Sequence, residues 1–125
     1  HKRATNPQAK SIAEVGVDRA AFARHMLLEL GRQHVKVSSY FAIDPWLSSA
    51  VPFREAFEEL LRFWPAVKIV HGTGAEASTW VNDSSLHFAF IDAVHDFKHV
   101  MLHLKAWWPK IKVGGVLAGH DYAPE

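Results

Sequence analysis

The chain has 125 residues, the size of one compact domain, and 49% of them are hydrophobic while 22% are charged, a composition that excludes a largely disordered protein. It has no cysteine, which excludes disulfides, thiolate zinc sites and cysteine nucleophiles and is typical of a reducing compartment such as the cytoplasm. Lys and Arg number 14 against 13 Asp and Glu, so the formal net charge of +1 gives no strong field that would attract nucleic acid or an anionic membrane.

The first half of the chain predicts two strand–helix units. A strand at residues 11–15 ends at Gly16 and is followed by a helix that Gly31 is expected to end as a left-handed cap. A second strand at residues 40–43 precedes a helix whose apolar side chains recur at helical spacing up to Pro65.

The second half continues the alternation of strands and helices. Two more strand–helix units and a last strand are predicted at residues 67–70, 75–81, 86–91, 97–108 and 116–118. The helix at residues 97–108 has the clearest apolar face, on which we expect Phe97, Met101 and Leu104 to point to the core. Gly114 and Gly115 are expected to turn the chain into the last strand.

Five apolar strands that alternate with four helices predict an α/β fold, a Rossmann-like, doubly wound parallel sheet with helices on both faces. We expect one such domain over residues 11–125, after a polar segment at residues 1–10. Right-handed crossovers would place all five strand ends along one edge, and ligands of such sheets bind in the crevice outside that edge.

Acids, histidines, glycines and one threonine gather at the predicted strand ends. They are Glu14, Gly16, Asp44, His71, Gly72, Thr73, Asp92, His95, His120 and Asp121. Gly16 would let the first turn approach a ligand, and a helix that begins near Arg19 would point its N-terminus to the same place. Asp44, at the tip of the second strand, could accept hydrogen bonds from the hydroxyls of a ribose, or it could cap the turn before Pro45.

Four segments of the chain resemble class I S-adenosylmethionine-dependent methyltransferases. They are AEVGVDRAAFARHML, FAIDPW, FAFIDAVHDF and KVGGVLAGHDY, and the last two resemble a small-molecule branch with IDAxH and GGVxxGHD motifs. The resemblance covers roughly residues 11–122. It implies S-adenosylmethionine as the cofactor.

The resemblance also implies roles for the residues at the strand ends. Glu14 and Gly16 would contact the methionyl part of the cofactor, Asp44 would hold the ribose, and Trp46 would wall the adenine. Gly72, Thr73 and Asp92 are expected to complete the cofactor site.

Three features depart from the family pattern. Gly16 is followed by Val17-Asp18-Arg19-Ala20 where further glycines are usual, and Gly72-Thr73 stands where an acid commonly meets the adenine amino group. The chain also ends at Glu125, where an antiparallel hairpin of two more strands should begin. We therefore expect a partner chain, a homodimer or a longer protein to cover the edge of the fifth strand.

Methyl transfer needs little acid–base chemistry beyond removal of a proton from the acceptor. We expect His95 or His120 to be the base, with Asp121 orienting the ring. Asp92, His120 and Asp121 also match the positions at which some oxygen-methylating relatives hold a divalent ion. Because histidine departs from the all-oxygen ligand set of magnesium, the presence of a metal is left open.

Structural roles compete with several of these assignments. His95 and Asp96 could cap the fourth helix, and Asp121 could close a loop. His99 and His103 have the i, i+4 spacing of a metal pair, but they lie opposite the expected apolar face and should point to solvent. Three tryptophans fit the apolar faces and are expected in the core. They are Trp64, Trp107 and Trp108.

The sequence therefore predicts an S-adenosylmethionine-dependent methyltransferase that acts on the oxygen or nitrogen of a small molecule. The alternative is a methyltransferase-like module that has lost catalysis and binds a partner. A nicotinamide-binding domain is disfavoured because residues 16–21 lack the G-x-G-x-x-G pattern.

Overall fold

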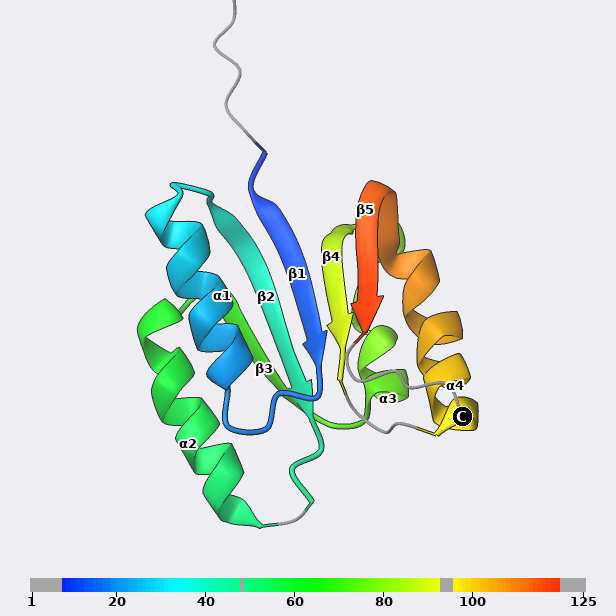
Figure 1. The fold of residues 1–125 in the computed structure, drawn as a ribbon, viewed down its shortest axis with the longest axis horizontal. Helices are drawn as coiled ribbons and strands as arrows, with labels where there is room; N and C mark the ends of the chain where they lie inside the picture. Colours follow the sequence, from blue (N-terminus) through cyan, green and yellow to red (C-terminus); the bar gives the residue numbers. More distant parts are fainter. Residues whose placement is uncertain (1–7, 48, 93–95, 120–125) are drawn as a thin grey trace, which may run out of the picture.

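Five parallel strands form one sheet in the computed structural model, which describes residues 8–47, 49–92 and 96–119 (Figure 1). The strands are β1 (Lys10–Val15), β2 (Val37–Asp44), β3 (Val67–His71), β4 (Leu86–Ile91) and β5 (Ile111–Gly119), in the order β3-β2-β1-β4-β5. The order reverses between β1 and β4, which makes that junction the topological switch point of the sheet. The predicted fold class is confirmed.

Side chains alternate along each strand, so the sheet has apolar residues on both faces. Helices cover both of these faces. The helices are α1 (Ala21–Arg32), α2 (Ala50–Leu60), η1 (Leu61–Phe63), α3 (Gly74–Ser78), α4 (Phe97–Trp107) and η2 (Trp108–Lys110). α1 and α2 pack with Ile12 and Tyr40 in one core, and α3 and α4 pack with Ala13 and Val15 in the other. None of the helices within the described ranges is long and apolar enough to span a bilayer.

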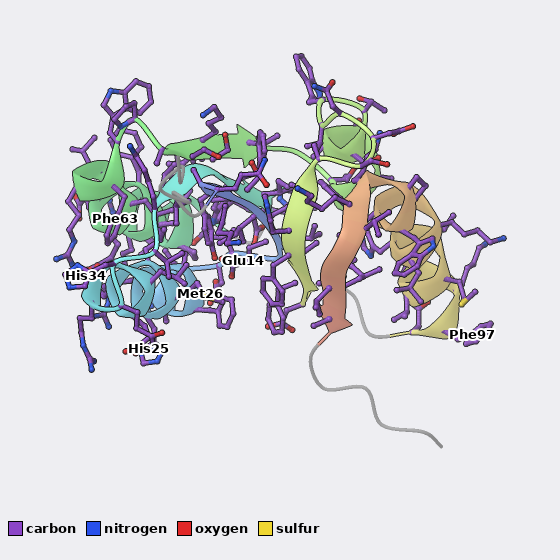
Figure 2. All side chains as sticks on the ribbon, turned by 90° about the horizontal axis from the view of Figure 1, so that it is seen from above. Glu14, His25, Met26, His34, Phe63 and Phe97 are labelled. Atoms are coloured by element: carbon purple, nitrogen blue, oxygen red, sulfur yellow. The ribbon has the colours of Figure 1, made fainter. Side chains whose placement is uncertain are left out.

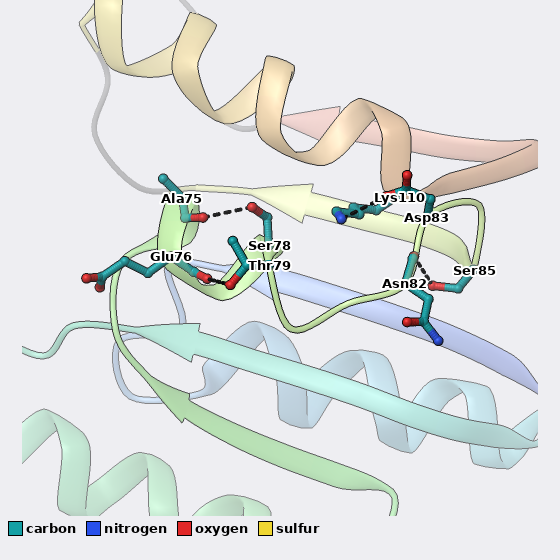
Figure 3. Close-up of polar contacts among 8 residues, drawn as sticks. All are labelled: Ala75, Glu76, Ser78, Thr79, Asn82, Asp83, Ser85 and Lys110. Carbon is teal, nitrogen blue, oxygen red and sulfur yellow. Dashed lines mark hydrogen bonds and ion pairs between the residues drawn. The ribbon is translucent and has the colours of Figure 1, made fainter.

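The coverage of the second face is incomplete. The short α3 leaves a hollow of about 620 Å³ over β2 and β3, lined by Phe41, Val70 and Trp80 among others. The helix predicted at residues 75–81 ends at Ser78, where side-chain hydroxyls bond the carbonyl oxygens of its own turn (Figure 3).

Helix α1 runs past the glycine that was predicted to end it. Gly31 lies inside the helix, and the left-handed residue is His34, with φ 61°. The backbone N–H of Val35 donates to the carbonyl of Leu30 and that of His34 to the carbonyl of Gly31, a closed Schellman motif. The prediction of a Gly31 cap was wrong because histidine takes the left-handed position three residues later.

Helix α4 turns a different face to the sheet than its apolar pattern predicted. His103 is 8% exposed and Trp107 is fully buried, whereas Phe97 is 75% and Trp108 64% exposed. Figure 2 shows Phe97 at the outer end of this helix. The expected solvent position of His103 and the expected burial of Phe97, Leu104 and Trp108 were therefore wrong. The helix has more apolar side chains than one face can hold, and its contacts with α3 select the His103–Trp107 face.

Trp64 was also predicted in the core and is 72% exposed, so that expectation was wrong. Helix α2 ends at Leu60, and one 3₁₀ turn, η1, separates it from Trp64. Trp64 follows that turn and is no longer on the buried face of α2.

Strand β5 begins five residues earlier than predicted and includes the expected Gly114-Gly115 turn. Its pairing with β4 is irregular between Leu86 and Phe88, where Ile111 and Val116 are the respective partners. Gly114 has φ 87°, and a Cβ atom on Gly115 would lie 2.9 Å from the carbonyl oxygen of Leu86. The glycines thus permit a bulge within the strand and do not end it.

Candidate functional site

Backbone hydrogen bonds join the ends of four neighbouring chain segments at one edge of the sheet. The N–H of Gly16 donates to Ile43 O at 2.8 Å, and that of Asp92 donates to Val15 O at 2.7 Å. The N–H of Gly72 donates to Asp44 O at 3.1 Å. The turns that follow β1, β2, β3 and β4 are therefore held side by side, as the parallel topology predicted.

Asp44 joins the turn after β1 to the turn after β2. Its Oδ2 accepts a hydrogen bond from the N–H of Asp18 at 2.8 Å, and its Oδ1 accepts one from the N–H of Trp46 at 2.7 Å. The carboxylate thus faces the Gly16 turn. It also caps its own turn, so the structural role proposed for it is confirmed, while ribose binding stays a prediction.

The turn after β1 has a backbone shape that glycine favours. Gly16 has φ 99°, and two non-glycine residues, Asp18 with φ 53° and Ala20 with φ 71°, are also left-handed. Ala20 immediately precedes α1, whose N-terminus therefore lies at this edge. The chain keeps the curled turn although it lacks the usual glycines.

Trp46 is packed tightly beside this turn. Only 7% of it is exposed, and its indole Nε1 donates to the carbonyl oxygen of Asp18 at 2.7 Å. The ring makes T-shaped contacts with Phe53 and His71, with centroids 5.0 and 5.5 Å away. The expected role of Trp46 as a wall for adenine stays a prediction, and its burial leaves little of the residue exposed for such a contact.

His71, at the end of β3, has a fixed orientation. Its ring stacks on Phe53 with centroids 5.1 Å apart, and its Nε2 lies 2.7 Å from the carbonyl oxygen of Pro45. Because a carbonyl oxygen only accepts, Nε2 carries the proton of this hydrogen bond. The sequence placed His71 at a strand end without indicating a role for it.

Thr73 and Glu76 form a capping box at the start of α3. Thr73 Oγ1 accepts from the N–H of Glu76 at 3.2 Å, and Glu76 Oε1 accepts from the N–H of Thr73 at 3.2 Å. The hydroxyl of Thr73 also donates to Glu76 Oε1 at 3.1 Å. Glu76 was missed, although the pattern of a threonine followed three residues later by glutamate could have identified it.

Glu14 lies inside the protein next to the Gly16 turn. It is 2% exposed, and its Oε1 accepts a hydrogen bond from Tyr40 Oη at 2.8 Å. Burial is the largest cause that raises the pKa of Glu14 to about 8, with smaller contributions from the charges of Asp92 and Asp44. Tyr40 was not identified from the sequence, where it reads only as an apolar strand residue.

Some of the remaining candidates lie outside the described part of the chain, and one, Asp96, lies within it. His95, His120 and Asp121 lie outside the described residues. Asp96 caps α4 by accepting from the N–H of His99 at 2.9 Å, and this backbone hydrogen bond is the main reason that the pKa of Asp96 is lowered. The helix-capping role proposed for Asp96 is confirmed.

The histidines of α4 do not form a metal pair. His99 Nδ1 lies 2.8 Å from Asp96 Oδ2, and His103 is buried against Gly74. Within the described part of the chain, no three His, Cys, Asp or Glu side chains are placed to hold a metal ion.

Comparison with known proteins identifies the fold. A family model described as "Methyltransferase domain" matches residues 13–122. A comparison with curated protein sequences found no match.

The solved structures that are similar to this chain include the following three. A Corynebacterium glutamicum protein has a TM-score of 0.63 and 19% identity over 89% of this chain and 48% of its own. An rRNA methylase from Streptococcus thermophilus has a TM-score of 0.66 and 10% identity over 90% of this chain and 63% of its own. A geranyl diphosphate C-methyltransferase from Streptomyces coelicolor, solved with S-adenosyl-L-homocysteine, has a TM-score of 0.64 and 14% identity over 88% of this chain and 39% of its own. The chain thus spans less than two thirds of each of these structures.

Proposed function

We propose that this chain, which belongs to the family of methyltransferase domains, transfers a methyl group from S-adenosylmethionine to an oxygen or nitrogen of a small molecule. The observation that carries the proposal is the position of Asp44, whose carboxylate at the end of β2 lies across the Gly16 turn at the end of β1. This pairing of a carboxylate with a close backbone turn is the arrangement that holds a nucleoside in doubly wound sheets.

The described residues fit an adenosyl cofactor. A carboxylate has about four acceptor positions, and the backbone fills two of those on Asp44, which leaves capacity for the two ribose hydroxyls. Gly16, in its left-handed turn, would admit the methionyl part, and we place the almost fully buried Glu14 behind this turn, close to the same part. We place Trp46, Gly72, Thr73 and Asp92 around the remainder of the cofactor.

The bound cofactor supplies a methyl group on a positively charged sulfur, open to in-line attack by the acceptor. The chain would then contribute positioning and a proton acceptor. We assign the base to His95 or His120, oriented by Asp121, because these residues come soon after β4 and β5 in the sequence and these two parallel strands end at the same edge of the sheet. No role for a metal is proposed.

The acceptor is proposed to be a small molecule because the formal charge of +1 offers little attraction for RNA. The similar fold of an rRNA methylase shows that the fold alone does not select the acceptor. Incubation with radiolabelled S-adenosylmethionine and either total RNA or a small-molecule extract would separate the two classes. Transfer of label to RNA alone would contradict our proposal.

Calorimetric titration with S-adenosylmethionine tests the cofactor assignment. We expect saturable binding by the wild type and none by Asp44→Ala. Asp83→Ala is the matched control, because Asp83 is an exposed acid that pairs with Lys110 at 2.8 Å just before β4 begins, at the opposite edge of the sheet (Figure 3). Circular dichroism would verify that each variant is folded.

A non-catalytic module is the second candidate. It is favoured by the use of both Asp44 oxygens in backbone hydrogen bonds, which gives this acid a sufficient structural role. A folded wild type that binds no S-adenosylmethionine would support this candidate and contradict methyl transfer.

A further inference from the structure

The buried pair of Glu14 and Tyr40 lies at the switch point of the sheet. Glu14 is the penultimate residue of β1, next to both β2 and β4, and Figure 2 shows it in the interior of the molecule. Tyr40, on β2, is fully buried, and its hydroxyl group donates a hydrogen bond to Glu14 Oε1 at 2.8 Å. The carboxyl group is thus fixed two residues before the Gly16 turn.

The charges around Glu14 disfavour its ionised form. Asp44 on the β2 side and Asp92 on the β4 side both act on it with negative charge. Helix α1, which covers this face of the sheet, buries only Ala23 and Leu27. None of the ion pairs found among the described residues includes Glu14. A buried carboxyl without a neighbouring cation is more stable when it holds its proton, in agreement with its pKa of about 8.

We propose that Glu14, held by Tyr40, distinguishes the cationic cofactor from its neutral product. This inference rests on the proposed function. S-adenosylmethionine has a sulfonium, an ammonium and a carboxylate group, and S-adenosylhomocysteine lacks the sulfonium charge. When the sulfonium lies at the Gly16 turn, the O–H bond of Glu14 breaks, its proton leaves to the solvent and the electron pair stays on the carboxylate. When the charge is lost in methyl transfer, Glu14 takes a proton back from the solvent.

This loss and regain of the Glu14 proton would make the site bind the substrate, S-adenosylmethionine, more tightly than the product, S-adenosylhomocysteine. Below the pKa of Glu14, the affinity for S-adenosylmethionine should rise by up to about tenfold per pH unit, because binding releases one proton. The affinity for S-adenosylhomocysteine should stay nearly constant over the same range. The ratio of the two affinities therefore increases with pH.

Calorimetric titration in buffers of different ionisation enthalpy measures the protons released on binding. Near neutral pH we expect the wild type to release close to one proton with S-adenosylmethionine and almost none with S-adenosylhomocysteine. Glu14→Gln should abolish the release. Tyr40→Phe removes a hydrogen bond that stabilises the ionised acid, so it should shift the release to higher pH. Glu58→Gln, which changes an exposed acid on α2, is the matched control and should behave like the wild type.

Carbon-13 NMR of the Glu14 carboxyl in the wild type, free and with each ligand, reports whether this group is ionised. It tests the inference even if a variant fails to fold. A carboxyl that ionises only with S-adenosylmethionine supports the inference. Binding without proton release, equal release with both ligands, or unchanged release in Glu14→Gln would overturn it while leaving the cofactor assignment intact. Failure of both ligands to bind would overturn the cofactor assignment as well.

Discussion

The indole nitrogen of Trp107 donates a hydrogen bond to the carbonyl oxygen of Gly74, 3.1 Å away, and so joins the end of α4 to the start of α3. His103, one turn earlier, packs on the same glycine, where a Cβ atom would lie 2.7 Å from its ring. These contacts set the rotation of α4 against the sheet. They also hold the start of α3 close to Val15, the residue before the Gly16 turn.

Trp107→Ala should be the most damaging single truncation in this layer. It removes a fully buried ring and its hydrogen bond, so we expect a loss of about 3–5 kcal/mol in the free energy of unfolding. Trp108→Ala removes a ring that is 64% exposed and should cost less than about 1 kcal/mol. Urea denaturation of the two variants measures the difference. Equal losses would contradict the burial described for these neighbours.

Two glycine-to-alanine substitutions should change the stability of the protein in opposite directions. Gly115→Ala places a methyl group 2.9 Å from the carbonyl oxygen of Leu86, which should lower stability by about 1–3 kcal/mol. Gly31→Ala, inside α1 with no atom within 4 Å of the new Cβ, should raise stability by about 0.5–1 kcal/mol. Thermal denaturation provides the comparison. A stabilising effect of Gly115→Ala would show that the bulge in β5 is wrong.

The stability of the protein should depend on the protonation of Glu14. The pKa of this acid rises from an ordinary 4.5 to about 8 in the folded state, so the folded protein holds a proton that the unfolded chain has lost between these values. Stability from this group is complete below about pH 4.5 and falls as the pH rises, by up to about 1.4 kcal/mol per pH unit, until it is lost above about pH 8.

Denaturation of the wild type and Glu14→Gln across this pH range isolates the effect. The glutamine variant should lack the decrease, so the difference between the two free energies should change steadily with pH. Other groups, such as His103, whose pKa burial lowers, act on both proteins alike and cancel in the difference. A constant difference would mean that Glu14 is ionised throughout.

The capping box of α3 predicts a contrast between two substitutions of Thr73. Thr73→Ala removes the acceptor for the N–H of Glu76 and should cost about 1 kcal/mol. Thr73→Ser keeps the hydroxyl and should be nearly neutral. Amide hydrogen exchange at Glu76 measures the loss directly, and equal protection in both variants would contradict the cap.

The strands and their shared edge were predictable from the sequence because they depend on local patterns. Five apolar runs with polar or glycine residues at their ends suffice to place Gly16, Asp44, Gly72 and Asp92 along one edge of a parallel sheet. The register of the strands is not local. Tyr40 could not be recognised as the partner of Glu14 without knowing that β1 and β2 place them on the same face.

The face of α4 could not be predicted because its sequence has more apolar positions than one side of a helix can bury. The choice between Phe97 and His103 depends on Gly74, which lies on a different element and admits the histidine ring only because it lacks a side chain. The end of α1 was missed for a related reason. Glycine is the commonest left-handed cap, but His34 takes that conformation here, with φ 61°.

Contacts within the chain itself maintain the curled shape of the turn after β1, with Asp18 and Ala20 left-handed and the carboxylate of Asp44 accepting from the N–H of Asp18 at 2.8 Å. The entropy of ordering these residues is lost during folding, not during association. A ligand at this edge would therefore meet a rigid, preorganised cradle, and its rate of capture would be limited by diffusion and orientation more than by loop rearrangement.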